Sequence, residues 1–186
     1  GTQWALHGPD MEASLDAALT GCSNITAMAV REGTVYLAAD GACVLACSLD
    51  GMLLWKQEAP AIDRFFSAQD GRLLARARQE QALYLLEDGA IRRLCAMPDL
   101  FCTGIEQLYP GDQTPYDCIV CANDAFFGWS IAEEAVTQLF TCDAVGLYAG
   151  DILDFCSLGN DRYLGLEWAP SASGEPGCTL FWLTPV

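Results

Sequence analysis

The sequence predicts an all-β protein: a β-propeller-like array of about four four-stranded antiparallel blades. The first observation behind this prediction is the stretch 25–57, in which four short apolar runs are separated by turns. Each turn contains an acidic residue followed by glycine, a pair that adopts the positive φ values of tight hairpins. These pairs are Glu32-Gly33, Asp40-Gly41 and Asp50-Gly51. Three hairpin signals in one short stretch indicate an antiparallel meander.

The second observation is a constant spacing between turns. Gly33 and Gly71 are 38 positions apart, and so are Gly51 and Gly89. Repeats of about 40 residues are typical of the four-stranded blades of propellers. We therefore predict a single domain spanning 1–186, with blades at about 25–57, 62–97, 104–142 and 151–186.

The individual strands follow from the short apolar or alternating runs between turn residues. In the first blade these runs cover residues 27–30, 35–38, 43–49 and 52–55. In the second blade they cover 63–66, 73–76, 82–86 and 91–95. In the third blade they cover 105–109, 116–120, 125–130 and 136–141. The fourth blade has only three candidates, at 152–157, 163–167 and 179–183.

The fourth blade lacks an outermost strand, because residues 180–183 align with residues 83–86, which are a third strand. Two explanations are open. In the first, a strand at 2–7 completes the last blade, since Trp4 matches Trp55 of an outermost strand. In the second, the chain is a partial propeller. Apolar residues at helical spacing predict a short helix or an irregular linker at 11–19.

The charge of the chain excludes two classes of partner. It contains 25 Asp and Glu residues against 9 Lys and Arg residues, which gives a formal net charge of −16. Affinity for nucleic acids depends on cationic side chains that neutralise phosphates, so we expect no nucleic-acid partner. No apolar stretch reaches the roughly 20 residues that a membrane span needs, so we expect no membrane insertion of this segment.

The ten cysteines are expected to be mainly buried thiols. The chain has a single CxxC pair, Cys118 and Cys121, and a single histidine, His7. The paired knuckles of a zinc site are therefore absent. Most cysteines lie inside apolar runs, where a thiol behaves as a small hydrophobic group. One or two disulfides between distant strands are the alternative, and we expect neither a metal nor a cofactor.

No pattern in the sequence predicts a catalytic site. His7 is the only imidazole and stands beside the Gly8-Pro9 turn, whereas nucleophilic catalysis requires a base held against Ser or Cys. Phosphate-binding loops, dinucleotide fingerprints and HExxH motifs are absent. Because the acidic residues that stand in turns are explained by the turns themselves, we expect no catalytic residues and no enzyme.

Three aromatic residues are the candidates for ligand binding: Trp168, Tyr163 and Trp129. Aromatic rings can stack on a sugar or a peptide, although rings in such folds more often pack between blades. We expect exposure at Trp168, which precedes a long loop of Pro, Ser and Gly residues at 169–177. Long loops in compact β folds often carry function.

Three short motifs in the second half of the chain resemble the β-propeller-like regions of exported bacterial lipoproteins, which precede a solute-binding domain. The motifs are Tyr116-Asp117, Phe126-Phe127-Gly128-Trp129 and Asn160-Asp161-Arg162-Tyr163-Leu164, and the resemblance extends over about 24–186. It implies an extracytoplasmic location at the cell surface and recognition of a ligand or partner. It also implies a solute-binding domain in the same full-length chain, and no catalytic residue.

Two classes of function follow. The first is a noncatalytic ligand-binding, protein-binding or scaffold module of an exported bacterial surface protein, with a protein, a small molecule or a glycan as its ligand. The second is a carboxylate- or metal-dependent hydrolase that acts on glycans from a propeller scaffold. Two carboxylates in a concave pocket with aromatic walls would favour the hydrolase. If neither class of function holds, the expected role is a spacer that positions another domain.

Overall fold

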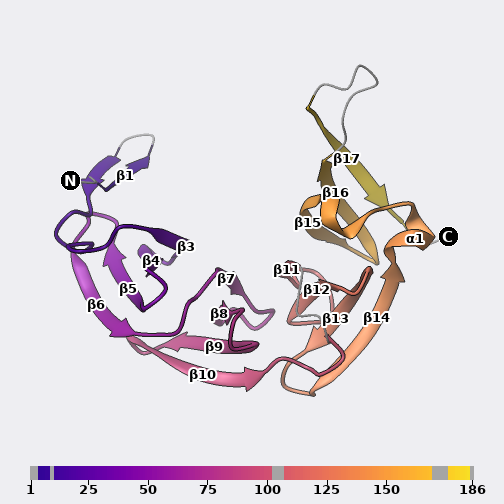
Figure 1. The fold of residues 1–186 in the computed structure, drawn as a ribbon, viewed down its shortest axis with the longest axis horizontal. Helices are drawn as coiled ribbons and strands as arrows, with labels where there is room; N and C mark the ends of the chain where they lie inside the picture. Colours follow the sequence, from indigo (N-terminus) through magenta and orange to yellow (C-terminus); the bar gives the residue numbers. More distant parts are fainter. Residues whose placement is uncertain (1–3, 9–10, 102–106, 169–175, 185–186) are drawn as a thin grey trace. The chain divides into compact units, whose positions relative to one another are not determined.

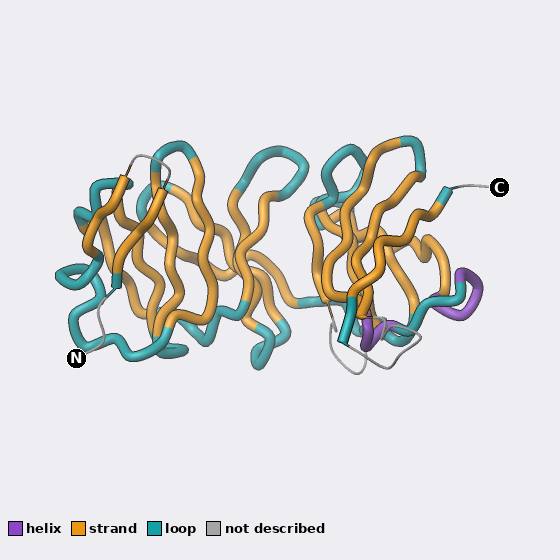
Figure 2. Tube along the Cα trace, turned by 90° about the horizontal axis from the view of Figure 1, so that it is seen from above, coloured by secondary structure: helices purple, strands orange, loops and turns teal. Residues whose placement is uncertain are grey.

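The computed structural model describes residues 4–8, 11–101, 107–168 and 176–184, and nearly all of its regular structure is β-strand (Figure 1 and Figure 2). Two short helical elements are present among these residues, α1 (Cys142–Val145) and the 3-10 turn η1 (Ala149–Asp151). Within the same residues, no helix is long and apolar enough to cross a membrane. The all-β prediction is confirmed.

Four antiparallel sheets correspond to the predicted blades, and in each of them the strands are adjacent in chain order. Blade 1 consists of β3 (Ile25–Arg31), β4 (Thr34–Ala39), β5 (Cys43–Ser48) and β6 (Leu53–Glu58). Blade 2 consists of β7 (Arg64–Ser67), β8 (Leu73–Ala77), β9 (Ala82–Glu87) and β10 (Ala90–Ala96). Blade 3 consists of β11 (Gln107–Pro110), β12 (Cys118–Ala122), β13 (Ala125–Ser130) and β14 (Ala135–Thr141). Blade 4 consists of β15 (Ile152–Gly159), β16 (Arg162–Trp168) and β17 (Cys178–Leu183).

The chain divides into two compact units. One comprises residues 1–66 and 72–97, and the other comprises residues 67–71 and 98–186. Blades 1 and 2 belong to the first unit, apart from residues 67–71, and blades 3 and 4 belong to the second.

The turns confirm the spacing argument. Gly33 and Gly71 occupy the first turn of blades 1 and 2, and Gly51 and Gly89 occupy the last turn of the same blades. Their φ angles lie between 75° and 86°, a region that glycine enters at little steric cost. The constant spacing therefore reflects equivalent hairpins in two successive blades.

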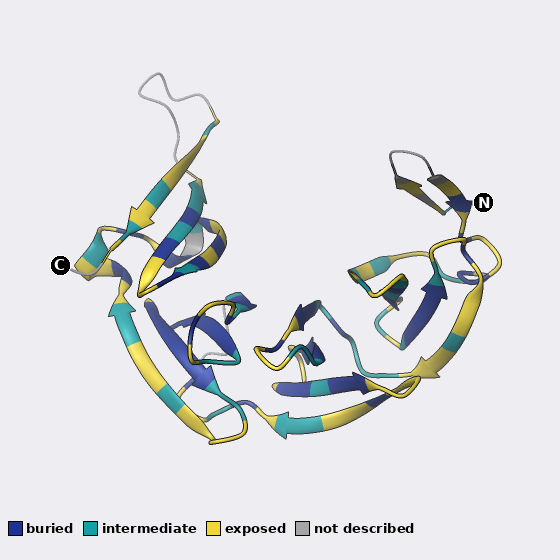
Figure 3. Cartoon of the chain, turned by 180° about the vertical axis from the view of Figure 1, so that it is seen from behind, coloured by how far each residue is buried: buried dark blue, intermediate teal, exposed yellow. Residues whose placement is uncertain are grey.

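Each unit buries an apolar layer between its two blades. In the first unit, Ala38 and Val44 of blade 1 pack with Phe65 of blade 2. In the second unit, Phe155 of blade 4 lies 4.5 Å from Phe126 of blade 3, between ring centroids. Aromatic pairs of this kind contribute about 1 kcal/mol each beyond the area that they bury. Figure 3 shows the result: β12 and β13 are mostly buried, whereas β6, β14 and β17 carry many exposed residues.

The N-terminal strand forms a local hairpin in the first unit, and its completion of blade 4 stays a prediction. Strand β1 (Ala5–Gly8) pairs with β2 (Met11–Ser14), and the Leu15 N–H donates to the carbonyl oxygen of Trp4 at 2.8 Å. Residues 2 and 3 of the predicted strand lie outside the described residues. Local pairing is favoured because closing a short hairpin loop costs less entropy than joining distant segments.

The residues that follow the N-terminal hairpin cover one face of blade 1. The helix expected within 11–19 is not formed, because Met11–Ser14 is a strand and turns follow it. The apolar residues that suggested helical spacing are nevertheless buried: Leu15, Ala18 and Leu19 pack on Leu37 and Leu45 of blade 1. Their spacing reflects this contact rather than a helix.

The cysteines differ in how far they are buried. Cys47, Cys118, Cys121 and Cys142 are buried, as expected of thiols inside apolar runs. Cys156 and Cys178 are exposed thiols in blade 4, and Cys102 lies outside the described residues. No group of three or more His, Cys, Asp or Glu residues in the described part of the chain is arranged to hold a metal ion.

Candidate functional site

Two of the three predicted binding residues are buried in the second unit. Trp129 is 2% exposed and meets Phe101 edge-on at a centroid distance of 6.2 Å. Tyr163 is 5% exposed and stacks on Phe155 at 5.2 Å, and burial raises the pKa of its phenol. The rings of Trp129 and Tyr163 therefore pack in the core of the second unit.

Trp168, the third predicted residue, is exposed. Its side chain is 42% accessible at the end of β16, opposite Cys178 of β17. Residues 169–175 of the long loop lie outside the described residues. The exposure expected at Trp168 is confirmed, and its role in binding is still a prediction.

Trp168 belongs to an exposed apolar face of blade 4. Leu164 pairs with Trp182, and Leu166 pairs with Leu180. Because side chains alternate along a strand, these residues point away from the core formed by the opposite face. Leu180 and Trp182 are 61% and 68% exposed. We name this surface the exposed face of blade 4 and define it by Leu164, Leu166, Trp168, Leu180 and Trp182.

The equivalent positions are buried in blade 1. Val35 pairs with Cys47 just after the first turn, as Tyr163 pairs with Leu183. This register makes Val44 the counterpart of Leu180 and Ala46 the counterpart of Trp182. Both counterparts are 0% exposed.

In each unit, the corresponding face of the first blade is covered by the second blade of the same unit. In the first unit, blade 2 packs on the face of blade 1 that contains Val44. In the second unit, blade 4 packs on Phe126 and Ile119 of blade 3. The exposed face of blade 4 thus has the composition of an inter-blade surface while its largest side chains are open to solvent.

Leu180 and Trp182 were missed by reasoning from the sequence, which assigned aromatic residues on strands to the core. The sequence carries no local signal for this exposure, because it depends on whether another blade packs on the face. A pocket of about 250 Å³ lies on the same face, lined in part by Leu164, Leu166 and Leu180. The walls are mainly apolar, which favours an apolar occupant.

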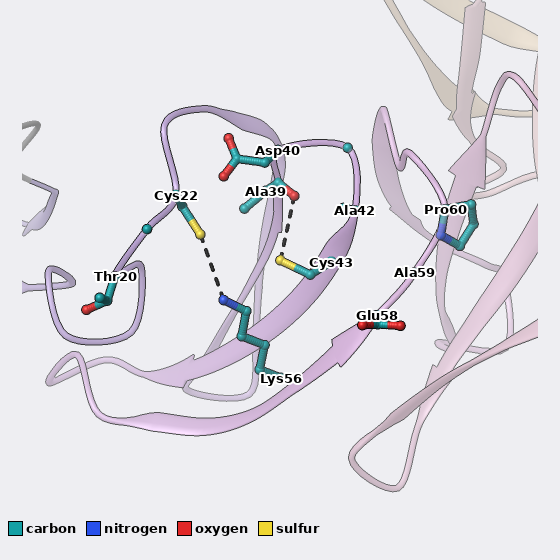
Figure 4. Close-up of a pocket in the computed structure, with 12 residues that line it drawn as sticks. Thr20, Cys22, Ala39, Asp40, Ala42, Cys43, Lys56, Glu58, Ala59 and Pro60 are labelled. Carbon is teal, nitrogen blue, oxygen red and sulfur yellow. Dashed lines mark hydrogen bonds between the residues drawn. The ribbon is translucent and has the colours of Figure 1, made fainter.

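A second candidate lies in the first unit, where an open cavity of about 740 Å³ is lined by the segment 20–22, the turn after β4 and the end of β6 (Figure 4). Cys22 and Cys43 both line it. Lys56, the only lysine of the chain, places its Nζ 3.9 Å from the Cys22 Sγ. Glu58 also borders the cavity.

The groups around this cavity have a structural role rather than a chemical one. The Asp40 carboxylate accepts from the Ser23 N–H at 3.0 Å, the Ser23 hydroxyl at 2.8 Å and the Asn24 N–H at 2.9 Å. Asp40 therefore holds the segment that leads into β3. Burial raises the pKa of the Cys22 thiol although Lys56 opposes this shift, so the thiol stays protonated and weakly nucleophilic at neutral pH.

The cavity also lacks the pattern expected of a glycoside hydrolase. Asp40 and Glu58 both line it, but none of the lining residues that the structure describes is aromatic. Asp40 is already bound by the backbone and hydroxyl donors of its own unit. Of the two candidates, the exposed face of blade 4 is the better binding site.

Comparisons with known proteins agree with the architecture. No family profile and no curated protein sequence matches the chain, but solved structures resemble it. One is an extracellular domain of a one-component system from B. thetaiotaomicron, with 13% identity, a TM-score of 0.52, and coverage of 77% of this chain and 20% of that one. Another is virginiamycin B lyase from Staphylococcus aureus, with 13% identity, a TM-score of 0.52, and coverage of 99% and 75%. The computationally designed protein Ika4 has 14% identity, a TM-score of 0.52, and coverage of 87% and 92%.

Identities this low show the fold alone. The chain spans about a fifth of the length of the Bacteroides extracellular domains that it resembles. The sheets and the comparisons together define the class: a β-propeller-like protein of four antiparallel blades, whose structural neighbours include extracellular domains of bacterial proteins.

Proposed function

We propose that the protein is a noncatalytic, protein-binding module of an exported bacterial surface protein, and that the exposed face of blade 4 is its binding site. One observation carries the proposal: the face of blade 1 that corresponds to this one is covered by blade 2, whereas Leu180 and Trp182 of blade 4 are exposed. Apolar patches of this kind mark interaction surfaces, because covering them contributes roughly 25 cal/mol per Å².

The shape of the site favours a protein over a small molecule. Side chains from β16 and β17 form the surface, and its pocket of about 250 Å³ is smaller than the roughly 300 to 1,000 Å³ of ordinary ligand sites. An exposed apolar surface that contains tryptophan is instead typical of the central region of a protein interface.

The structural neighbours support the proposed location. Two of them are extracellular domains of a bacterial signalling protein, which fits the resemblance to exported lipoproteins at Tyr116-Asp117 and Asn160-Asp161. We propose that this module lies outside the cytoplasmic membrane, at the cell surface, and, as the resemblance implies, that a solute-binding domain belongs to the same full-length chain.

Site-directed photocrosslinking of the full-length protein in its source bacterium tests the proposal. A photoreactive amino acid replaces Trp182, and in a matched control it replaces Met28, which is a similarly exposed apolar residue at 58% but lies in blade 1. We expect one discrete adduct with another protein at position 182, absent at position 28. The adduct should weaken at least about tenfold in a Leu180→Glu background, since a charge at the centre of an apolar interface is costly. Equal adducts at the two positions, or no change with Leu180→Glu, would overturn the proposal.

A further inference from the structure

We infer that Cys22 and Cys43, two reduced thiols of the first unit, form a site of reversible oxidation, at which a low-molecular-weight disulfide converts them to an intramolecular disulfide. The bond joins the chain before β3 to the sheet of blade 1. This inference goes beyond the proposed function and is independent of it, because the exposed face of blade 4 belongs to the other unit.

The two thiols belong to one layer of the first unit. Cys43 lies on the face of β5 that also presents Leu45, because side chains alternate along a strand. Residues 15–22, which we name the covering segment, lie on this face through Leu19. A turn then leads to Cys22, whose N–H donates to the Leu19 carbonyl oxygen at 2.8 Å. Cys22 and Cys43 both pack against the same apolar cluster, so the covering segment and the sheet each contribute one thiol to it.

Hydrogen bonds hold the backbone on both sides of the pair. The Asp40 N–H donates to the Asn24 carbonyl oxygen at 3.0 Å, which ties the residues after Cys22 to the end of β4. Ala39, the last residue of β4, is the cross-strand partner of Cys43 and accepts from its thiol at 3.6 Å. Because both thiols are anchored to the same end of β4, each meets the other at a high effective concentration.

An open cavity gives a reagent access to both thiols. Cys22 and Cys43 are partly buried and line the cavity of about 740 Å³ described above, and Figure 4 shows both side chains directed into it. Sites for small molecules usually have volumes of roughly 300 to 1,000 Å³, so a small disulfide has room to reach a sulfur atom. Cys47 lies on the same face of β5 but is 0% exposed, which closes it to such a reagent.

Lys56 favours Cys22 as the thiol that reacts first, because its Nζ lies 3.9 Å from the Cys22 Sγ. Burial is the main cause that raises the pKa of Cys22, and the Lys56 ammonium lowers it. Cys43 and Asp40 raise this pKa further, since a second negative charge nearby repels a thiolate. Cys22 is therefore mainly protonated at neutral pH, and its exchange is slow but assisted by Lys56.

Oxidation proceeds in two exchange steps. Cys22 loses its proton to water and attacks one sulfur of the reagent, so that a mixed disulfide forms, the S–S bond of the reagent breaks and one thiolate leaves. Cys43 then loses its proton and attacks the Cys22 sulfur, and the second thiolate leaves. The two released thiolates take up the two protons. Two protein thiols are thus oxidised, and one reagent disulfide is reduced to two thiols.

The role of the bond is structural, because it fixes the covering segment on blade 1. A cross-link between positions 22 and 43 restricts the unfolded chain and thereby favours the folded one. The Tm of the protein should therefore rise by at least about 4 °C on oxidation. The same oxidant should leave the Tm of a Cys43→Ala variant without this increase.

Glutathione disulfide is the probe that tests the inference on the whole protein. After incubation in native buffer, remaining thiols are alkylated and the protein is digested with chymotrypsin, which cleaves after Leu45 and so separates Cys43 from Cys47. We expect a cross-linked peptide that contains Cys22 and Cys43. Its equilibrium constant against glutathione should be at least about tenfold larger in native buffer than in concentrated guanidinium, because the fold holds the thiols together. Equal constants, or no such peptide, would overturn the inference, and this comparison needs no variant.

Two variants separate the pair from its neighbours. Cys47→Ala is the matched control, since it removes a thiol from the same face of β5, and it should retain the cross-link. Cys43→Ala should stop at a glutathione adduct on Cys22, which Lys56→Gln in the same background should slow by at least about threefold. A native cross-link from Cys22 to Cys47 would overturn the assigned pair. An unchanged rate with Lys56→Gln would overturn the role of Lys56.

Discussion

Arg76 is a buried charge inside the otherwise apolar strand β8, and Asp63 is its counterion. The Arg76 Nε donates to both carboxylate oxygens of Asp63, at 3.0 and 3.1 Å. Arg76 is 4% exposed, so the loss of its partner would leave a charge in an apolar layer. The sequence alone does not reveal this burial, because charge does not tell which strands are buried on both faces.

We predict that Asp63→Ala lowers the free energy of unfolding by about 2–3 kcal/mol. The value is below that of a fully buried pair, because the side chain of Asp63 is partly exposed. The control is Glu87→Ala, which removes the exposed partner of Arg92 and should cost less than about 0.5 kcal/mol. Urea denaturation measures both, and similar losses would show that burial of Arg76 does not matter.

The carboxyl of Asp40 gives a prediction for pH dependence. Hydrogen bonds from the Ser23 hydroxyl and backbone, followed by the bond from Asn24, lower its pKa below the ordinary value of 3.8. A lowered folded pKa stabilises the protein above pH 3.8, and this stabilisation is lost as the pH falls through the folded pKa. In an NMR titration of side-chain carboxyl carbons, Asp40 should titrate below 3.8, and Ser23→Ala should move its midpoint upward. An unchanged midpoint in Ser23→Ala would contradict the assignment of this hydrogen bond as the main cause.

The candidate site shows what single residues reveal before the fold is known. Trp129, Tyr163, Trp168 and Trp182 are all aromatic residues on strands, and nothing in their type separates core from surface. Trp168 was predicted correctly because the loop after it is a local feature. Trp182 was missed because its exposure depends on whether another blade packs on that face of blade 4, which the residue type does not reveal.

At the scale of elements, the hairpin turns determine most of the fold. Asp-Gly and similar pairs predicted the strands of blades 1 and 2 within a few residues, because positive φ angles restrict where the chain can reverse. The N-terminal segment was predicted less well. The assignment of Trp4 to the last blade depended on one matching tryptophan, whereas the pairing of β1 with β2 follows from proximity along the chain.

The last turn of blade 1 provides a test at this scale. A Cβ at Gly51 would lie 2.3 Å from the carbonyl oxygen of Ser14, whereas a Cβ at Gly33 would meet nothing within 4 Å. Both glycines have positive φ, so both alanine variants carry the same kind of conformational penalty. We predict that Gly51→Ala lowers the free energy of unfolding by at least about 1–2 kcal/mol more than Gly33→Ala. Equal losses in chemical denaturation would mean that β2 does not restrain this turn.

At the scale of the whole molecule, the sequence repeat predicted four blades. The formal net charge of −16 does not favour this fold over another. Charge instead acts on stability, because 25 acidic residues held together in the folded state repel one another. The number of blades could be read from spacing since each blade is a local meander. Which blade faces are covered could not be predicted from the spacing, because this depends on contacts between blades.

We predict that salt stabilises the folded protein. Raising the ionic strength from about 0.01 M to 0.15 M shortens the screening length from about 30 Å to about 8 Å, so repulsion among the acidic side chains weakens. The Tm should rise by a few degrees, and sodium chloride and choline chloride should act equally, since screening does not depend on the identity of the cation. Calcium chloride at matched ionic strength should give no increase beyond theirs. A larger increase with calcium in differential scanning calorimetry would point to a specific cation site and would contradict screening as the sole cause.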